Sequence, residues 1–128
     1  VRALGALDGD DVYLVCSNRP HDFAGMGPQV EVIEVPLPAA ALEPVWDHVL
    51  LPRALRRRRV DLYHGIKGAL PIALACPRVV TIHDLAIYAC PETFAWQQHL
   101  HMRPHLRLAA RQAAHVIADS AHARDDIG

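Results

Sequence analysis

The sequence lacks the features that mark several specialised classes of protein. It has only three cysteines, Cys16, Cys76 and Cys90, an odd number without zinc-type spacing, which indicates free thiols in a reducing compartment. Its longest apolar runs, such as residues 69–76, fall far short of the ~20 residues needed to span a bilayer. The net charge is only −1, so the chain has no bulk attraction to nucleic acid or anionic lipid. We therefore expect a cytoplasmic protein.

The composition is that of an ordinary globular protein. Apolar residues make up 52% and charged residues 21% of the 128 positions, which excludes wholesale disorder and fibrous classes. The length fits one domain with a core and is too short for two typical domains. The chain begins at Val1, inside what reads as a helix, without an initiator methionine. We therefore expect a single domain that is a fragment of a longer protein.

Five short segments rich in β-branched and aromatic residues predict strands. Turn residues or proline follow the first two, at residues 17–20 and at Pro36. The second segment alternates apolar residues with Glu31 and Glu34, which is typical of a strand near a sheet edge. The predicted strands are residues 11–16, 29–35, 60–64, 78–83 and 115–119.

Helical spacing of apolar residues separates most of these strands. Residues 1–7 read as the tail of a helix, and residues 42–58 form an amphipathic pattern that Pro52 should kink or divide. A short turn-helix is expected between the third and fourth strands, and residues 94–114 form a long helix with a kink at Pro104. Strands separated by helices predict an α/β fold with a parallel sheet covered on both faces.

The fourth strand ends at a polar pair. The apolar run 79–82 stops at His83 and Asp84, and ligands of open α/β sheets bind beyond the carboxyl ends of the strands. A neutral imidazole can donate a hydrogen bond, and a carboxylate can accept from hydroxyl groups. The alternative is that Asp84 caps a turn while His83 merely ends the strand.

Two other strands are followed by candidate site residues. His64, Gly65 and Lys67 lie at the end of the third strand, where a flexible loop with one cation would contact substrate or phosphate. A plain turn explains the same residues equally well. Ser120 follows the fifth strand, and it would cap the next helix, whose free amides attract an anion. Capping alone also accounts for Ser120.

The arginines and histidines suggest further binding sites, but the evidence for these sites is weaker than for the residues at the strand ends. Arg53 and the run 56–59 would bind phosphate, anionic lipid or nucleic acid by charge, although a solvated helix end is the simpler interpretation. His101 and His105 have the spacing of a helical metal pair, but Pro104 lies between them and no Cys or Glu cluster completes a set. We expect no metal site there, and we expect His99, His101 and His105 to lie on an exposed helix face.

Several of these segments occur in a familiar order. The motifs are Leu51-Pro52-Arg53, Val60-Asp61-Leu62-Tyr63-His64, Val80-Thr81-Ile82-His83-Asp84-Leu85, Pro91-Glu92, and Ala118-Asp119-Ser120 with Asp126-Ile127. Together they resemble the N-terminal half of group 1 glycosyltransferases, those of family 4 with the GT-B fold. The resemblance covers residues 45–127, and residues 1–16 resemble the end of the first helix and the second strand of that half.

The resemblance implies a fold and an arrangement of domains. It implies a Rossmann-like parallel sheet with helices on both faces, in a single truncated N-terminal, acceptor-side domain over residues 1–128. The first strand and the C-terminal donor-binding domain would be absent from this chain. If the strand order is 3-2-1-4-5-6, the absent strand belongs between residues 12–16 and 60–64.

The resemblance also implies a reaction. Such enzymes transfer a sugar, here of the hexosyl or mannosyl type, from a nucleotide-sugar donor to a hydroxyl of a glycan or lipid-linked acceptor. The anomeric configuration is retained, and neither a metal nor another cofactor is required. His83 would be the catalytic residue, with substrate-binding roles for Asp84, His64, Gly65, Lys67 and Ser120. The fragment alone would be inactive, and a lipid-linked acceptor would favour peripheral contact with a membrane.

One alternative belongs to a different class of protein. The same crevice at the strand ends would serve a non-catalytic α/β module that binds a small anion or a protein partner. Nucleic-acid binding through the arginine run is disfavoured by the near-neutral charge and the lack of interleaved aromatic residues.

Overall fold

The structure is a computed structural model that describes the chain except for residues 1–2, 4–5, 7–8, 20–22, 24 and 38–41. Most of the helix predicted at residues 1–7 therefore lies outside the described residues. The chain divides into two compact units, Val1–Ala54 and Leu55–Gly128. Each unit has its own parallel sheet with helical segments around it, which confirms the predicted α/β class and its Rossmann-like character.

The first unit is built on two parallel strands. Strand β1 (Tyr13–Ser17) pairs with β2 (Val30–Glu34) in a register that sets Val15 opposite Val32. Alternation of apolar and glutamate side chains exposes Glu31 and Glu34 on β2, as predicted for an edge strand. The neighbouring Val35 is almost fully buried, so the core of this unit begins where the strand ends.

The helix predicted at residues 42–58 is unbroken from Glu43 to Arg56, but its middle is a π-helical turn. It consists of α1 (Glu43–Val45), a π-helical turn η4 (Trp46–Leu50) and α2 (Leu51–Arg56). Pro52 has no N–H to donate to the carbonyl of His48, and the wider π turn lies just before it. Within the first unit, the indole N–H of Trp46 donates to the Val35 carbonyl at 2.8 Å and ties η4 to the end of β2.

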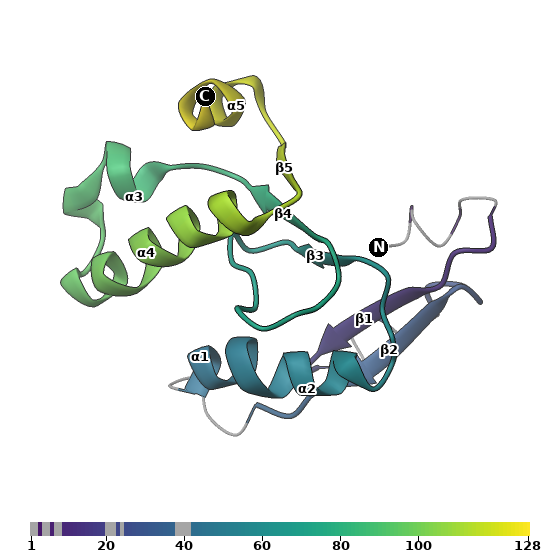
Figure 1. The fold of residues 1–128 in the computed structure, drawn as a ribbon. Helices are drawn as coiled ribbons and strands as arrows, with labels where there is room; N and C mark the ends of the chain where they lie inside the picture. Colours follow the sequence, from purple (N-terminus) through teal and green to yellow (C-terminus); the bar gives the residue numbers. More distant parts are fainter. Residues whose placement is uncertain (1–2, 4–5, 7–8, 20–22, 24, 38–41) are drawn as a thin grey trace. The chain divides into compact units, whose positions relative to one another are not determined.

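The second unit contains a sheet of three parallel strands in the order β3-β4-β5 (Figure 1). The strands are β3 (Tyr63–Gly65), β4 (Arg78–Ile82) and β5 (His115–Ala118). Strands β4 and β5 each end one residue earlier than predicted. His83 and Asp119 are therefore the first residues after their strands, at the edge of the sheet where ligands of α/β folds bind.

Strand β5 remains mostly exposed, and helical segments follow β4 and β5. They are α3 (Ala86–Ala89), the 3-10 turn η5 (Pro91–Thr93), α4 (Trp96–Gln112) and α5 (Ala121–Ile127). The C-terminal part of α4 lies beside β4 (Figure 1), and Ala109 of α4 packs with Val80 and Ile82 in the core. Helix α4 continues through Pro104 as one helix, and Gln98 closes its first turn by accepting from the Ala95 N–H at 2.8 Å.

The turn-helix predicted between β3 and β4 was wrong. Residues 66–77 contain turns and bends but no helical segment. Gly68 has a positive φ of 70°, and Pro71 and Pro77 have no N–H for helical hydrogen bonds. Only the middle of the segment is buried, at Gly68, Leu70 and Pro71, and Leu70 joins the core beside Val80.

Candidate functional site

Three chain segments meet at the carboxyl-end edge of the second sheet. The register of β4 with β5 pairs Ile82 with Ala118, so the residues that follow, His83 and Asp119, leave the sheet side by side. Strand β3 runs parallel to β4 and leads into the loop that begins at Ile66. The fold therefore gathers His83, Asp119 and the backbone of Ile66 from three different strand ends.

His83 is held at both ring nitrogens. Its Nδ1 lies 2.6 Å from Oδ2 of Asp119, and its Nε2 lies 2.9 Å from the carbonyl oxygen of Ile66. A neutral imidazole carries a single N–H, whereas the protonated ring carries two and can donate to both acceptors. The side chains of His83 and Asp119 are each about half exposed, so the pair is open to a ligand from solvent.

These contacts favour the protonated form of His83. The hydrogen bond to Asp119, and after it the bond to the Ile66 carbonyl, raises the pKa of His83 above the ordinary value of 6.5. Desolvation opposes this rise in the pKa, while the negative charges of Asp119 and Asp84 add to it. The sequence alone suggested a neutral imidazole; the structure indicates a cationic donor, suited to an anionic or hydroxyl-bearing ligand.

Asp84 caps a turn, as the alternative interpretation predicted. Its Oδ1 accepts from the backbone N–H of Ala86 at 2.9 Å, which fixes the turn that leads into α3. The residue is exposed, and its charge also acts on the neighbouring His83. Asp84 therefore shapes the loop and contributes negative charge to the site.

His64 and Gly65 lie within β3 rather than after it. Nε2 of His64 is 2.8 Å from the hydroxyl of Thr81, a nearly buried residue of β4, so this ring is linked to the neighbouring strand. Gly65 is required by packing: a Cβ at this position would lie 2.3 Å from the Ala69 carbonyl oxygen and 3.0 Å from Leu70 Cδ2. Gly65 can therefore offer a ligand only its backbone.

The loop after β3 is folded back onto β4. Gly68 adopts the left-handed region, and its N–H donates to the Thr81 carbonyl at 3.1 Å. This anchor keeps the preceding residues, Ile66 and the exposed Lys67, near the strand end. The Ile66 carbonyl reaches His83 as a consequence.

Ser120 caps α5, as predicted. Its Oγ accepts from the Ala123 N–H at 3.0 Å, a bond that leaves the hydroxyl hydrogen unused. Asp119, Ser120 and Arg124 line an open pocket of about 630 Å³ beside β5. Asp119 therefore belongs both to the contact with His83 and to the lining of this pocket, and Ser120 lines the pocket next to it.

The histidines of α4 have local contacts. The rings of His101 and His105 lie 4.2 Å apart between centroids, and Nε2 of His99 is 2.8 Å from the Pro91 carbonyl oxygen. Across the residues that the structure describes, no group of three or more His, Cys, Asp or Glu side chains is arranged to hold a metal ion. Only His101 and His105 of the predicted trio share a contact, and His99 and His105 are partly buried rather than fully exposed.

Sequence reasoning did not assign a role to Asp119. The residue was counted as the end of the fifth strand, although it follows β5 in the structure. A usable signal was present, because the fourth and fifth predicted strands both end at a polar residue and parallel strands have their carboxyl ends at one edge. Placing His83 and Asp119 at the same edge of the sheet predicts their contact.

A parallel sheet with a polar cluster at its carboxyl ends defines this protein as an α/β domain of the Rossmann-like, ligand-binding class. The whole chain, residues 1–128, matches Glycosyltransferase Family 4, and the chain belongs to that family. No curated protein and no solved structure gave a significant match.

Family membership implies a glycosyltransferase, and with it the binding of a nucleotide-sugar donor. It thereby confirms the resemblance drawn from the motifs of residues 45–127. Within the described ranges, no helix is both long enough and apolar enough to cross a bilayer.

Proposed function

We propose that this chain is the acceptor-side, N-terminal part of a retaining glycosyltransferase that works in a cleft between two Rossmann-like domains. A nucleotide sugar would donate a hexose, mannose among the candidates, to a hydroxyl of a glycan or lipid-linked acceptor. The match to Glycosyltransferase Family 4 across residues 1–128 supports sugar transfer. The observation that carries the site assignment is the His83 ring held between Asp119 and the Ile66 carbonyl.

His83 is the catalytic residue in this proposal. A cationic N–H beside the transferred sugar would stabilise the negative charge that develops on the leaving phosphate oxygen. The ring would serve as a hydrogen-bond donor rather than as a nucleophile, because each of its nitrogens lies next to an acceptor, Oδ2 of Asp119 or the Ile66 carbonyl oxygen. Its half-exposed position suits a group that must meet a substrate.

The remaining candidates would bind substrate around His83. Asp84 would accept from acceptor hydroxyls with its carboxylate, and Lys67 would bring a cation on the loop after β3. Gly65 would contribute its backbone, since packing excludes a side chain there. His64 and Ser120 would donate through the ring N–H and the hydroxyl hydrogen, respectively.

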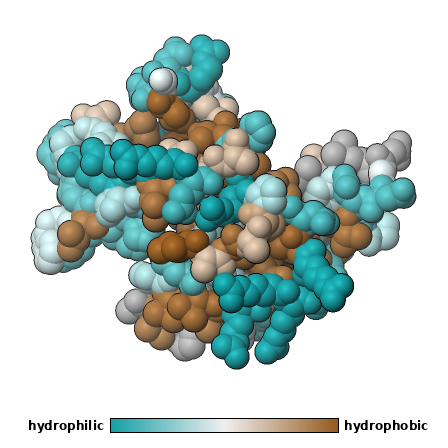
Figure 2. All heavy atoms as spheres, in the orientation of Figure 1, coloured by the Kyte–Doolittle hydropathy of each residue, from teal (hydrophilic) through white to brown (hydrophobic). Residues whose placement is uncertain are grey.

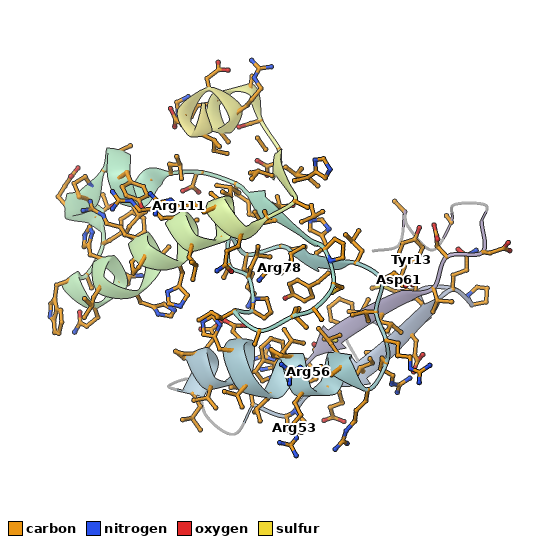
Figure 3. All side chains as sticks on the ribbon, in the orientation of Figure 1. Tyr13, Arg53, Arg56, Asp61, Arg78 and Arg111 are labelled. Carbon is orange, nitrogen blue, oxygen red and sulfur yellow. The ribbon has the colours of Figure 1, made fainter. Side chains whose placement is uncertain are left out.

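A cytoplasmic location with peripheral membrane contact completes the proposal. Arg53 and the run 56–59 are exposed, and strongly hydrophilic atoms gather over the end of α2 in Figure 2. Figure 3 shows Arg53 projecting outward from α2, whereas the guanidinium of Arg56 is 3.4 Å from the Ala73 carbonyl oxygen. A lipid-linked acceptor in an anionic membrane would attract such a cluster.

Direct assay of the complete protein tests the function. The protein is incubated with a panel of nucleotide sugars and with glycan and lipid-linked acceptors, and products are identified by mass spectrometry and NMR. We expect transfer of a sugar with retention at the anomeric carbon. Inversion would overturn the proposed stereochemistry. Binding of nucleotide sugars without any transfer would instead support the non-catalytic, anion-binding module.

A further inference from the structure

Asp119 is oriented toward His83 rather than toward the helix that follows it. The N-cap of α5 is supplied by Ser120, and Asp119 lies in the connection between β5 and that cap. Its carboxylate is turned to Nδ1 of His83 at 2.6 Å, while about half of the side chain stays exposed. A half-exposed carboxylate outside the helix cap is thus hydrogen-bonded to one nitrogen of the candidate catalytic ring.

The contact at Nδ1 determines what Nε2 can do. With Asp119 accepting from Nδ1–H, the ring cannot rotate about its Cβ–Cγ bond without losing a charge-assisted hydrogen bond. The opposite nitrogen, Nε2, is then a donor as well, and in the structure it is paired with the Ile66 carbonyl oxygen at 2.9 Å. Ile66 is 61% exposed and belongs to the turn after β3, so this contact lies at the protein surface, where a substrate oxygen would have to replace the Ile66 carbonyl at Nε2.

We propose that Asp119 is the positioning residue for His83: it accepts from Nδ1–H and fixes the orientation of the ring, so that Nε2–H can be presented to a substrate oxygen. The inference rests on the proposed function, because it extends the role of His83 in sugar transfer. Asp119 itself does not contact substrate in this arrangement. It acts through the orientation and charge of the imidazole.

The charged surroundings of His83 are consistent with this role. From β5 the ring faces Asp119, beside it on its own loop lies Asp84, and both charges favour the protonated ring. The loop after β3 meets the ring through the neutral Ile66 carbonyl and carries Lys67 one residue further on. Of the two carboxylates, Asp84 has a structural task at the start of α3, which leaves Asp119 as the hydrogen-bonding partner of the ring.

Histidine NMR titration of the complete protein tests the contact without relying on activity. In the wild type we expect His83 to titrate above the ordinary value of 6.5, with a lower pKa in Asp119→Asn, which keeps the shape of the side chain but removes its charge. Asp126→Asn is the matched control, because Asp126 is paired instead with His122 of α5 at 3.5 Å. A wild-type His83 that titrates below the ordinary value, or an Asp119→Asn titration equal to the control, would overturn the inference.

Kinetics then test the positioning role. In Asp119→Asn we expect kcat to fall by about 10-fold, a part of the ~100-fold expected for loss of the ring itself, with little change in KM. The loss of activity at high pH should begin at lower pH than in the wild type, and Asp119→Glu should restore part of the activity. An unchanged pH profile in a folded Asp119→Asn protein would refute the role.

The two tests fail separately. If the protein transfers no sugar with any donor, the proposed function is wrong, while the titration still reports whether Asp119 controls His83. If transfer occurs and the titration is unaffected by Asp119→Asn, only the positioning role is wrong.

Discussion

Nδ1 of His83 and a carboxylate oxygen of Asp119 lie 2.6 Å apart, although 36 positions separate the two residues in the sequence. The parallel register of β4 and β5 explains the contact, since Ile82 and Ala118 are the last paired residues. The next residue of each strand must leave the sheet at the same edge. The hydrogen-bonded pairing of these two strands thereby places the carboxylate of Asp119 next to the imidazole of His83.

Removal of the His83 ring should impair transfer in the complete protein. We expect His83→Ala to lower kcat by ~100-fold if the contact acts mainly in the transition state. Steady-state kinetics with a saturating nucleotide sugar measure the effect, and circular dichroism checks that the variant is folded. His122→Ala, on the exposed side of α5, is the control and should keep full activity. Near wild-type turnover in His83→Ala would remove the catalytic assignment.

Stability should depend on pH through the same ring. The pKa of His83 is raised in the folded state, so the stabilising contribution of the protonated ring is complete below about pH 6.5 and is lost as the pH rises through the folded-state pKa. Because the ring is half exposed, solvent screening keeps the contribution small. Urea unfolding at about pH 5 and about pH 9 should show a larger difference between wild type and Asp119→Asn at the lower pH. A difference that grows toward high pH would contradict the sign.

Gly65 should tolerate no side chain. A Cβ there would meet the backbone oxygen of Ala69 at 2.3 Å, so Gly65→Ala must displace the loop and should cost about 1–3 kcal/mol of unfolding free energy. Gly9→Ala is the matched control, because nothing lies within 4 Å of a Cβ at Gly9. Denaturant titration of both variants measures the difference. Equal stability of the two variants would show that the turn after β3 is not as tight as described.

Membrane contact should depend on the arginines after α2. We expect the double variant Arg57→Gln/Arg59→Gln to bind vesicles containing phosphatidylserine more weakly at low salt, by roughly 1 kcal/mol for each charge removed. The double variant Arg107→Gln/Arg111→Gln removes the same charge from α4 and serves as the control. Sedimentation of the complete protein with vesicles measures binding. Unchanged sedimentation of the first variant would indicate a solvated helix end.

The sheet edges give a prediction for the 128-residue chain in isolation. Among the described strands, β1 pairs only with β2, and β3 pairs only with β4, so each has one edge without a strand partner. We therefore propose that the isolated chain is marginally stable or associates through these edges. A cooperative melt of a monomer, measured by calorimetry and light scattering, would argue against this.

Much of the secondary structure could be predicted because its causes are local. The β-branched run 79–82 and the segment 115–118 form strands at the expected places, and Ser120 caps α5 through a bond only three residues long. The turn-helix expected before β4 failed for a reason that is also local, since Gly68 and two prolines oppose a helix. The prediction of a turn-helix gave too little weight to Gly68, Pro71 and Pro77.

The sequence by itself determined, to within one residue, where β4 and β5 end and therefore which polar residues reach the ligand-binding edge, because the strand-forming segments 79–82 and 115–118 stop at His83 and Asp119. It also carried the motifs that define the family. The tertiary structure decided which of those residues meet. The partner of His83 depends on the register between two strands 36 positions apart, and the Ile66 carbonyl depends on a turn packed against a third strand. Neither contact follows from local propensity, since both arise only when parallel strands align their carboxyl ends.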